Sequence, residues 1–223
     1  MIYVFDLDDT LYKEINYVYS GFQAVADNLE REYGWSSETS FQFMKQVMEQ
    51  KGRGAVFDEL LIKHNMYSKK LVRSCLAVYR RHYPVLQLSE DAENCLKRLQ
   101  SEQAVVYIVT DGHKEVQSMK LKSLGLFSRV RKCYITHRYG ISRAKPSPYC
   151  LLAIARREQT DPANIVYIGD NPVKDFVGIR PLGFRTIRIR QGAHQHVQLT
   201  PEYEAEIDIF SLNELKSIAW LRS

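Results

Sequence analysis

The chain has 223 residues, a length that suits one α/β domain or one such domain with a smaller insert, and its 45% of hydrophobic residues can form a sizeable core. Its 31 basic and 26 acidic residues give a net charge of +5, which indicates either a slightly basic surface or an attraction for anionic substrates. No basic run is long enough, or rich enough in aromatic residues, to predict nucleic-acid binding.

Cysteine usage and the N-terminus predict a reduced, cytoplasmic protein. The four cysteines form no CxxC pair and have no histidines around them at zinc-ligand spacing. The first ten residues lack a charged region, a long apolar segment and a cleavage site, so we expect no signal peptide. No apolar stretch approaches about 18 residues, so no membrane-spanning helix is expected. The cysteines are Cys75, Cys95, Cys133 and Cys150.

The first predicted element is a short apolar strand at 2–5 (IYVF) that ends in acidic residues. Residues i and i+2 of an extended segment face the same way, so Asp6 and Asp8 project together from the strand's carboxyl end. Two such carboxylates repel each other and are costly to desolvate. They indicate a bound cation, or a division into a nucleophile and an acid/base. The alternative is a strand leading into an acidic helix cap at Asp9 or Thr10.

The interval from about residue 12 to residue 88 contains no convincing strand and has the apolar spacing of amphipathic helices. An all-helical block after the first strand of an α/β domain is odd for packing alone, but it makes sense as a lid. We therefore predict a helical cap at 13–88, inserted in a catalytic core made of 1–12 and 89–223. The predicted cap helices span about 15–33, 38–50, 54–65 and 68–82.

After residue 88, short apolar strands alternate with helical patterns. This alternation predicts right-handed βαβ crossovers and a doubly wound parallel sheet, a Rossmann-like core. Residues 191–204 are polar and predict a surface loop, and a last short strand and helix are expected at about 206–219. The other strands are expected at 104–109, 132–136, 165–168 and 185–189, and the helices at 90–102, 113–124, 147–157 and 172–181.

Two of these elements carry groups that suit a phosphate. Thr110 ends the second strand and Gly112 follows in the turn, so a hydroxyl and free N–H groups could cradle a phosphate at a helix N-terminus. The alternative is a simple capped turn. Lys145, which Pro146 holds in extended geometry, could neutralise a carboxylate and a phosphate together. The alternative is an exposed lysine in a turn.

The strand at 165–168 again ends in carboxylates. Asp170 is placed as a metal ligand, and Asp175 as a second ligand or as a group that orients the others. A turn with a helix cap is the alternative. Ligands of open α/β sheets bind at the carboxyl ends of the strands, where these groups should meet. Mg²⁺ prefers a few carboxylates with phosphate oxygens, and phosphoryl transfer requires an in-line nucleophile and charge neutralisation.

Over nearly the whole chain, the sequence resembles the haloacid dehalogenase-like hydrolases. The order and spacing of that family's four signatures match. They are DxDx[TV] as Asp6-Leu7-Asp8-Asp9-Thr10, a strand-end hydroxyl as Thr110, a lysine as Lys145, and an acidic pair as Gly169-Asp170 with Asp175. The family pattern departs at Asp111, where many members have asparagine, and we assign this residue no catalytic role.

The resemblance implies that Asp6 attacks phosphorus to form an aspartyl-phosphate, while Asp8 protonates the leaving oxygen and then activates water. It also implies that the segment at 13–88 is the family's helical cap. The remaining implied roles are phosphate binding by Thr110, Gly112 and Lys145, magnesium binding by Asp6, the Asp8 backbone carbonyl and Asp170, and support of the metal or of Lys145 by Asp175.

Several functions remain open at this point. We favour a magnesium-dependent phosphatase acting on a small phosphorylated metabolite, either a sugar phosphate or a nucleoside monophosphate. A sugar phosphomutase on the same core and a non-catalytic binding protein are the alternatives. A dehalogenase is less favoured, because cleavage of a carbon–halogen bond does not need the acid at Asp8. Arg53, in a glycine-flanked loop, could bind a second anionic group of the substrate or could be a solvent-exposed arginine.

Overall fold

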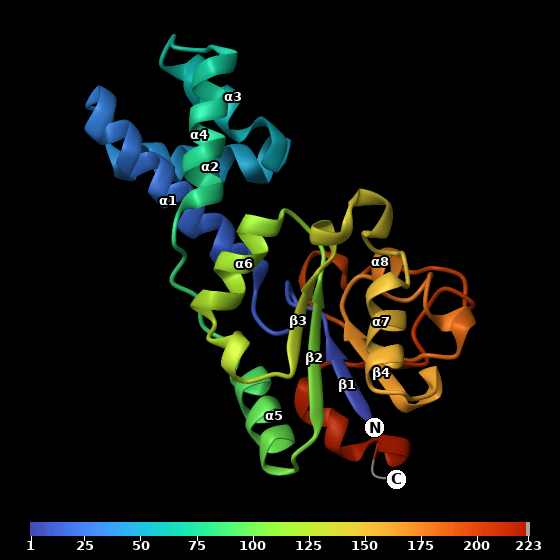
Figure 1. Cartoon of the computed structure of the whole chain (residues 1–223). Helices are drawn as coiled ribbons and strands as arrows, with labels where there is room; N and C mark the ends of the chain where they lie inside the picture. The colour runs from blue at the N-terminus through green and yellow to red at the C-terminus, as the bar shows by residue number, and fades with distance from the viewer. Residues whose placement is uncertain (222–223) are drawn as a thin grey trace. The chain divides into compact units, whose positions relative to one another are not determined.

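Six short strands form one parallel sheet in the computed structural model, which describes residues 1–221. Their order across the sheet is β3-β2-β1-β4-β5-β6, and every pairing is parallel (Figure 1). This confirms the predicted doubly wound α/β core. The strands are β1 (Ile2–Phe5), β2 (Val105–Thr110), β3 (Lys132–Ile135), β4 (Ile165–Gly169), β5 (Arg185–Ile189) and β6 (Ile207–Ile209).

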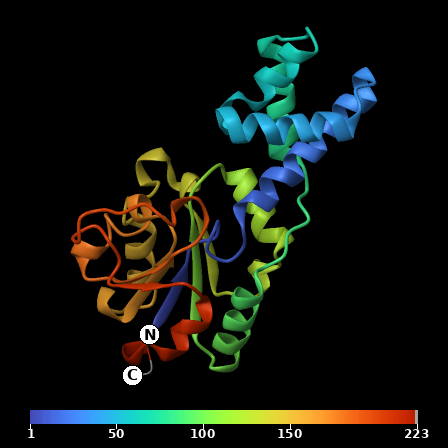
Figure 2. The ribbon, with the colours of Figure 1, turned by 180° about the vertical axis from the view of Figure 1, so that it is seen from behind.

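The chain reverses its direction of winding at β1. It runs from β1 through β2 to β3 on one side and then crosses to β4 on the other side, as both views show (Figures 1 and 2). Phe5 pairs with Ile108 of β2 and with Ile168 of β4, so the carboxyl ends of the three central strands lie level. Ligands of such sheets bind in the crevice at this reversal, which is where β1 and β4 release their acidic residues.

Both faces of the sheet are covered, and the alternation of side chains along β1 shows how. Ile2 and Val4 belong to a buried cluster with Leu151 and Ile154 of α7 (Tyr149–Arg157). Tyr3 is buried on the opposite face, where it lines a cavity with Arg98 of α5 (Glu90–Ser101) and with residues of the C-terminal segment. Strands buried on both faces read as continuous apolar runs, which is why the sequence predicted them.

The chain divides into two compact units. One comprises Met1–Glu14 with Leu86–Ser223, and the other is Ile15–Val85. The regular elements of the second unit are helices, packed around a core of its own that includes Phe22, Leu60 and Cys75. They are α1 (Glu14–Tyr33), α2 (Ser37–Lys51), α3 (Val56–Lys63) and α4 (Lys69–Arg81), with one short 3-10 helix at Arg53–Ala55. That this unit acts as a cap stays a prediction.

Two predicted helices differ in the structure. The helix expected at 172–181 is only α8 (Pro172–Asp175), followed by turns and a 3-10 helix at Arg180–Leu182. Pro181 lies in the first turn of this 3-10 helix, where a residue without an N–H is tolerated. The helix expected near the C-terminus is a pair of 3-10 helices, Leu212–Ser217 and Ala219–Leu221.

Between β2 and β3 lies α6 (Lys114–Ser123). In the described residues, no helix is both long and apolar enough to cross a membrane.

Candidate active site

A cavity of about 160 Å³ opens at the carboxyl ends of the central strands, and acidic side chains dominate its lining. Seven carboxylates and two lysines face it, so the cavity carries a large excess of negative charge. Burial disfavours such an excess unless a further cation enters the site or some of the carboxyl groups take up protons. The charged lining residues are Asp6, Asp8, Asp9, Glu14, Asp111, Asp170, Asp175, Lys145 and Lys174.

Asp6 follows β1 directly and lies against Lys145. The Lys145 Nζ contacts Asp6 Oδ1 and lies 2.9 Å from Asp175 Oδ1, and all three side chains are nearly inaccessible to solvent. Burial raises the pKa of Asp6 to about 7 in spite of Lys145. Burial alone would lower the pKa of Lys145, but Asp175 and Asp6 raise it well above its ordinary value. The lysine is therefore a fixed positive charge beside a carboxylate oxygen.

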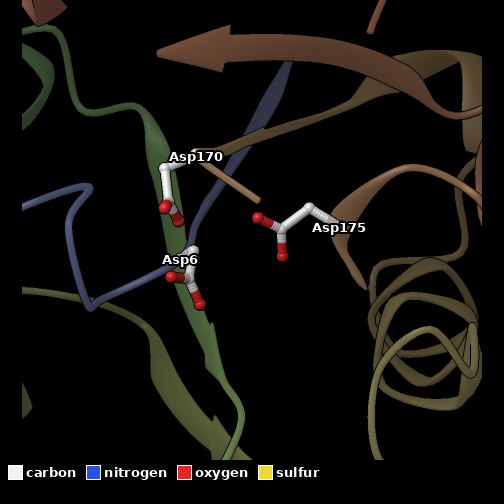
Figure 3. A group of neighbouring side chains, drawn as sticks. All are labelled: Asp6, Asp170 and Asp175. Atoms are coloured by element: carbon white, nitrogen blue, oxygen red, sulfur yellow. The ribbon is translucent and has the colours of Figure 1, made fainter. Parts of the chain in front are cut away.

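Asp170 follows β4 and completes an acidic cluster suited to a cation. Carboxylate oxygens of Asp6, Asp170 and Asp175 lie within 4.8 Å of one another, and Figure 3 shows the three side chains converging. Burial and the neighbouring Asp6 and Asp175 raise the pKa of Asp170 to about 9. Its carboxylate has no ion-pair partner in the described part of the chain. Hard oxygen ligands with uncompensated charge fit Mg²⁺.

Asp175 holds its neighbours in place with both oxygens. Oδ1 accepts from Lys145 and, at 3.2 Å, from the Tyr167 hydroxyl, while Oδ2 accepts from the Asn171 backbone N–H at 3.0 Å. These hydrogen bonds link Asp175 to Lys145 and to the turn after β4. Its role as a second metal ligand or as a supporting group stays a prediction.

The glycine before Asp170 makes room for that support. A Cβ at Gly169 would lie 2.3 Å from Asp175 Oδ2, closer than atoms can approach. We expect Gly169→Ala to push Asp175 off its donors and to lower the free energy of unfolding by about 1–3 kcal/mol, with a loss of activity. Thermal denaturation measures the first effect. Gly54→Ala is the control, because its Cβ would meet nothing within 4 Å. Equal melting temperatures for both variants would contradict the expectation.

Asp8 is held from another direction by three residues that the sequence analysis did not single out. Its Oδ1 accepts from the Tyr12 hydroxyl and from Lys120 Nζ at 2.7 Å, and its Oδ2 accepts from Gln117 Nε2 at 2.7 Å. Burial would raise the pKa of Asp8, but Lys120 and these hydrogen bonds bring it below its usual value. Asp6 and Asp8 thus have separate partners and opposite pKa shifts, so the two carboxyl groups are not equivalent.

Thr110 is linked to Asp8 through Gln117, and Gly112 follows two residues later; the cavity lining includes neither of them. The Thr110 hydroxyl is fully buried and accepts from Gln117 Nε2 at 2.7 Å, while Gly112 has φ +136°, a geometry that favours glycine. Between them in the sequence, Asp111 connects three neighbouring segments by hydrogen bonds. It accepts from the Thr136 hydroxyl, from the Lys145 backbone N–H at 3.1 Å and from Lys174 Nζ at 3.1 Å. Its negative charge is therefore compensated, which answers the question raised by an acid at this position.

The polar loop at 191–204 also reaches the cavity, which the sequence did not predict. Ala193 and His194 line it, and the Ala193 N–H donates to Asp9 Oδ2 at 3.4 Å. The fully buried Arg188 anchors the loop, because it donates to the His194 carbonyl at 2.7 Å and pairs with Glu204 at 2.8 Å. The segment RTIRI predicted a buried strand, but it did not indicate which of its two arginines points inward.

Arg53 belongs to the helical unit, Ile15–Val85. There it lines a cavity of about 280 Å³ whose walls include Phe57, Val72 and Tyr79 as well as Arg80. The cavity is mainly apolar, and its charged groups are two guanidinium groups and the carboxylate of Asp58. A contact between Arg53 and the substrate stays a prediction.

Comparison with known proteins agrees with this geometry. Residues 3–189 match the haloacid dehalogenase-like hydrolase family. A glyceraldehyde 3-phosphate phosphatase of Methanopyrus kandleri is 26% identical over 222 residues, covering 96% of this chain and 94% of that protein. A HAD-hydrolase from Bacillus subtilis, solved bound to magnesium, superposes with a TM-score of 0.66 at 20% identity, covering 97% of this chain and 96% of that one. A 2-haloacid dehalogenase from Pseudomonas syringae gives 0.65 at 20% identity, with both chains covered completely. The two solved structures show a shared fold.

Proposed function

The chain belongs to the haloacid dehalogenase-like hydrolase family, and from that premise we propose that it is a magnesium-dependent phosphatase of small phosphomonoesters. One observation carries the proposal. A buried lysine joins the carboxylate after β1 to the one in α8, while a second carboxylate, Asp8, is held separately beside them. Phosphoryl transfer through a phosphoenzyme requires a nucleophile with a positive charge held beside it, and a separate residue that acts as acid and base.

In the first half-reaction, an Asp6 oxygen attacks the phosphorus atom of the substrate. The bond between phosphorus and the ester oxygen breaks, and Asp8 in its protonated form gives a proton to that leaving oxygen. Lys145, already in contact with Asp6, balances the charge of the phosphoryl oxygens as they approach the carboxylate. The products are an aspartyl-phosphate and a free alcohol.

In the second half-reaction, Asp8 as a carboxylate takes a proton from water, and the resulting hydroxide attacks phosphorus. The bond between phosphorus and Asp6 breaks, inorganic phosphate leaves, and Asp8 is protonated again. Mg²⁺ would be held by Asp6, Asp170 and the Asp8 carbonyl, and would neutralise charge on the phosphoryl group. Thr110 and the Gly112 N–H are proposed to bind phosphoryl oxygens in both steps.

The substrate class can be tested directly. The cavity of about 160 Å³ supports a small ester, and the M. kandleri relative is named for a triose phosphate, so phosphorylated trioses come first in a screen with sugar phosphates and nucleoside monophosphates. We expect magnesium-dependent release of inorganic phosphate from at least one of them. Conversion to an isomeric sugar phosphate without release would instead identify a phosphomutase. A purified, folded protein inactive on every ester would contradict the proposal.

The helical unit is proposed to select the substrate rather than to perform the chemistry, because contacts with remote parts of a substrate supply specificity. If Arg53 binds a second anionic group, Arg53→Ala should raise KM for the preferred substrate roughly 10–100-fold, because the substrate loses the binding free energy of one charge-assisted hydrogen bond. Hydrolysis of a small aryl phosphate should change little.

Arg73→Ala is the matched control, since Arg73 is an exposed arginine of α4 in the same unit. Steady-state kinetics on both substrates decide the matter. Equal losses on the preferred substrate and on the aryl phosphate would assign Arg53 a structural role.

A further inference from the structure

Lys120 of α6 is a buried lysine with acidic neighbours. Its side chain is 3% exposed, and its Nζ lies 2.7 Å from Asp8 Oδ1 and 3.6 Å from Glu14 Oε1. Lysines are almost never buried so completely unless they are paired. This one is absent from the family signatures on which the sequence analysis relied, yet it contacts the residue proposed as the acid/base.

Gln117 presents a second group from the same face of α6, since residues three apart on a helix are neighbours. It is 2% exposed, and its Nε2 lies 2.7 Å from Asp8 Oδ2, 2.7 Å from Thr110 Oγ1 and 2.9 Å from the Asp111 carbonyl. With Lys120 on one carboxylate oxygen and Gln117 on the other, α6 fixes both the position and the rotation of the Asp8 carboxylate. Gln117 also ties Asp8 to the hydroxyl at the end of β2.

Packing alone does not account for these two side chains. A buried ion pair is weak evidence for stability, because apolar residues of similar volume usually stabilise a protein at least as well. The Gln117 Oε1 is buried and has no hydrogen-bond partner among the described residues, which is itself unfavourable. The arrangement is explained if its purpose is the orientation of Asp8, since an acid/base must reach both the leaving oxygen and the attacking water.

We propose that Lys120, together with Gln117, is a positioning residue that holds the Asp8 carboxylate in place for both proton transfers. This proposal rests on the phosphatase function proposed above. Lys120 contacts Asp8 and Glu14 and acts through Asp8, so its loss should impair only the steps in which Asp8 takes part. Attack by Asp6 on an ester with a good leaving group needs no proton and should not depend on Lys120.

The test compares Lys120→Met with the wild type on an alkyl phosphate and on an aryl phosphate with an acidic phenol. We expect kcat on the alkyl ester to fall about 10–100-fold with little change in KM, part of the full effect of acid/base catalysis. Phosphorylation of the enzyme by the aryl ester should stay within about threefold of the wild type. Rapid mixing should therefore show a burst of phenol followed by slow turnover. Lys122→Met, at an exposed lysine of the same helix, should behave as the wild type.

A double-variant cycle separates positioning from a general structural effect. Lys120→Met added to Asp8→Asn should slow the alkyl ester no further, because the residue being positioned is already lost. If Lys120→Met does not fold, Lys120→Gln, which keeps a hydrogen-bond donor at the buried position, carries the same comparison. With the aryl ester, a loss in the phosphorylation step as large as that in phosphoenzyme hydrolysis would overturn the role of Lys120, and so would additive losses in the double variant. A wild-type enzyme that releases no phosphate and forms no phosphoenzyme would overturn the phosphatase proposal instead.

Discussion

Asp6→Asn is expected to reduce phosphate release at least roughly 10⁴-fold, to the background of the assay, because the substitution removes the nucleophile and a proposed magnesium ligand together. The fold should survive. The amide has nearly the size of the carboxyl group, and Lys145 keeps Asp175 as a partner at 2.9 Å. Activity on the preferred ester, with the melting temperature measured in parallel, checks both statements. Substantial turnover by the asparagine variant would remove Asp6 from the role of nucleophile.

Removal of the metal should have the same consequence in the unaltered protein. A chelator is expected to abolish phosphate release, and added Mg²⁺ should restore it, because the excess of carboxylates in the cavity needs a cation before an anionic ester can approach. Asp170→Asn serves as the matched variant. It lowers the negative charge of the cluster without touching Asp6, so it should weaken magnesium binding more than it weakens folding. Full activity in chelator would contradict the magnesium requirement.

The sequence predicted the fold because the central strands are buried on both faces and therefore appear as uninterrupted apolar runs. Parallel strands also release their carboxyl ends at one edge, so Asp6 and Asp170, 164 positions apart in the chain, could be expected to meet there. The structure brings their carboxylates within 4.8 Å of each other, together with that of Asp175. These predictions needed only local patterns and one topological rule.

The partners of Asp8 could not be predicted in the same way. Gln117 and Lys120 lie on a helix with a weak apolar pattern, and nothing local says that these polar residues are its buried ones. The contact of the 191–204 loop with the cavity depends on Arg188, whose inward orientation is a tertiary effect. The helix predicted at 172–181 is α8, which ends after four residues, followed by turns and a 3-10 helix. Long-range contacts of polar side chains carry no periodic signal.

The second large effect is expected at Asp8, whose substitution should separate the two half-reactions. An alkoxide leaves poorly, so cleavage of an alkyl phosphate needs a proton on the leaving oxygen, and hydrolysis of the aspartyl-phosphate needs a base for water. Positioned acid/base catalysis contributes typically 10²–10⁴-fold. Asp8→Asn should therefore slow turnover of an alkyl phosphate by roughly that factor.

The site can accept this amide if one neighbouring side chain, Gln117, turns over. The new side-chain oxygen can still accept from Tyr12 and Lys120, as Asp8 Oδ1 does now. The new amide group would face Gln117 Nε2, but the Gln117 amide can turn and present Oε1, which has no partner in the described structure, in exchange for its hydrogen bonds to Thr110 and to the Asp111 carbonyl. Folding should thus be intact, and a change in rate can be attributed to the lost acid/base.

An aryl phosphate with an acidic phenol needs little help in the first step, so with this ester Asp8→Asn should form the phosphoenzyme quickly and lose it slowly. Rapid-mixing kinetics should then show a burst of phenol close to one equivalent per enzyme, followed by a slow steady state. If Asp8 only shaped the turn after β1 or the metal site, both half-reactions would weaken together and no burst would appear. The absence of a burst, with magnesium affinity and melting temperature unchanged, would therefore count against the acid/base role of Asp8. If the burst appears, the steady-state rate that follows it measures how strongly the activation of water depends on the Asp8 carboxylate.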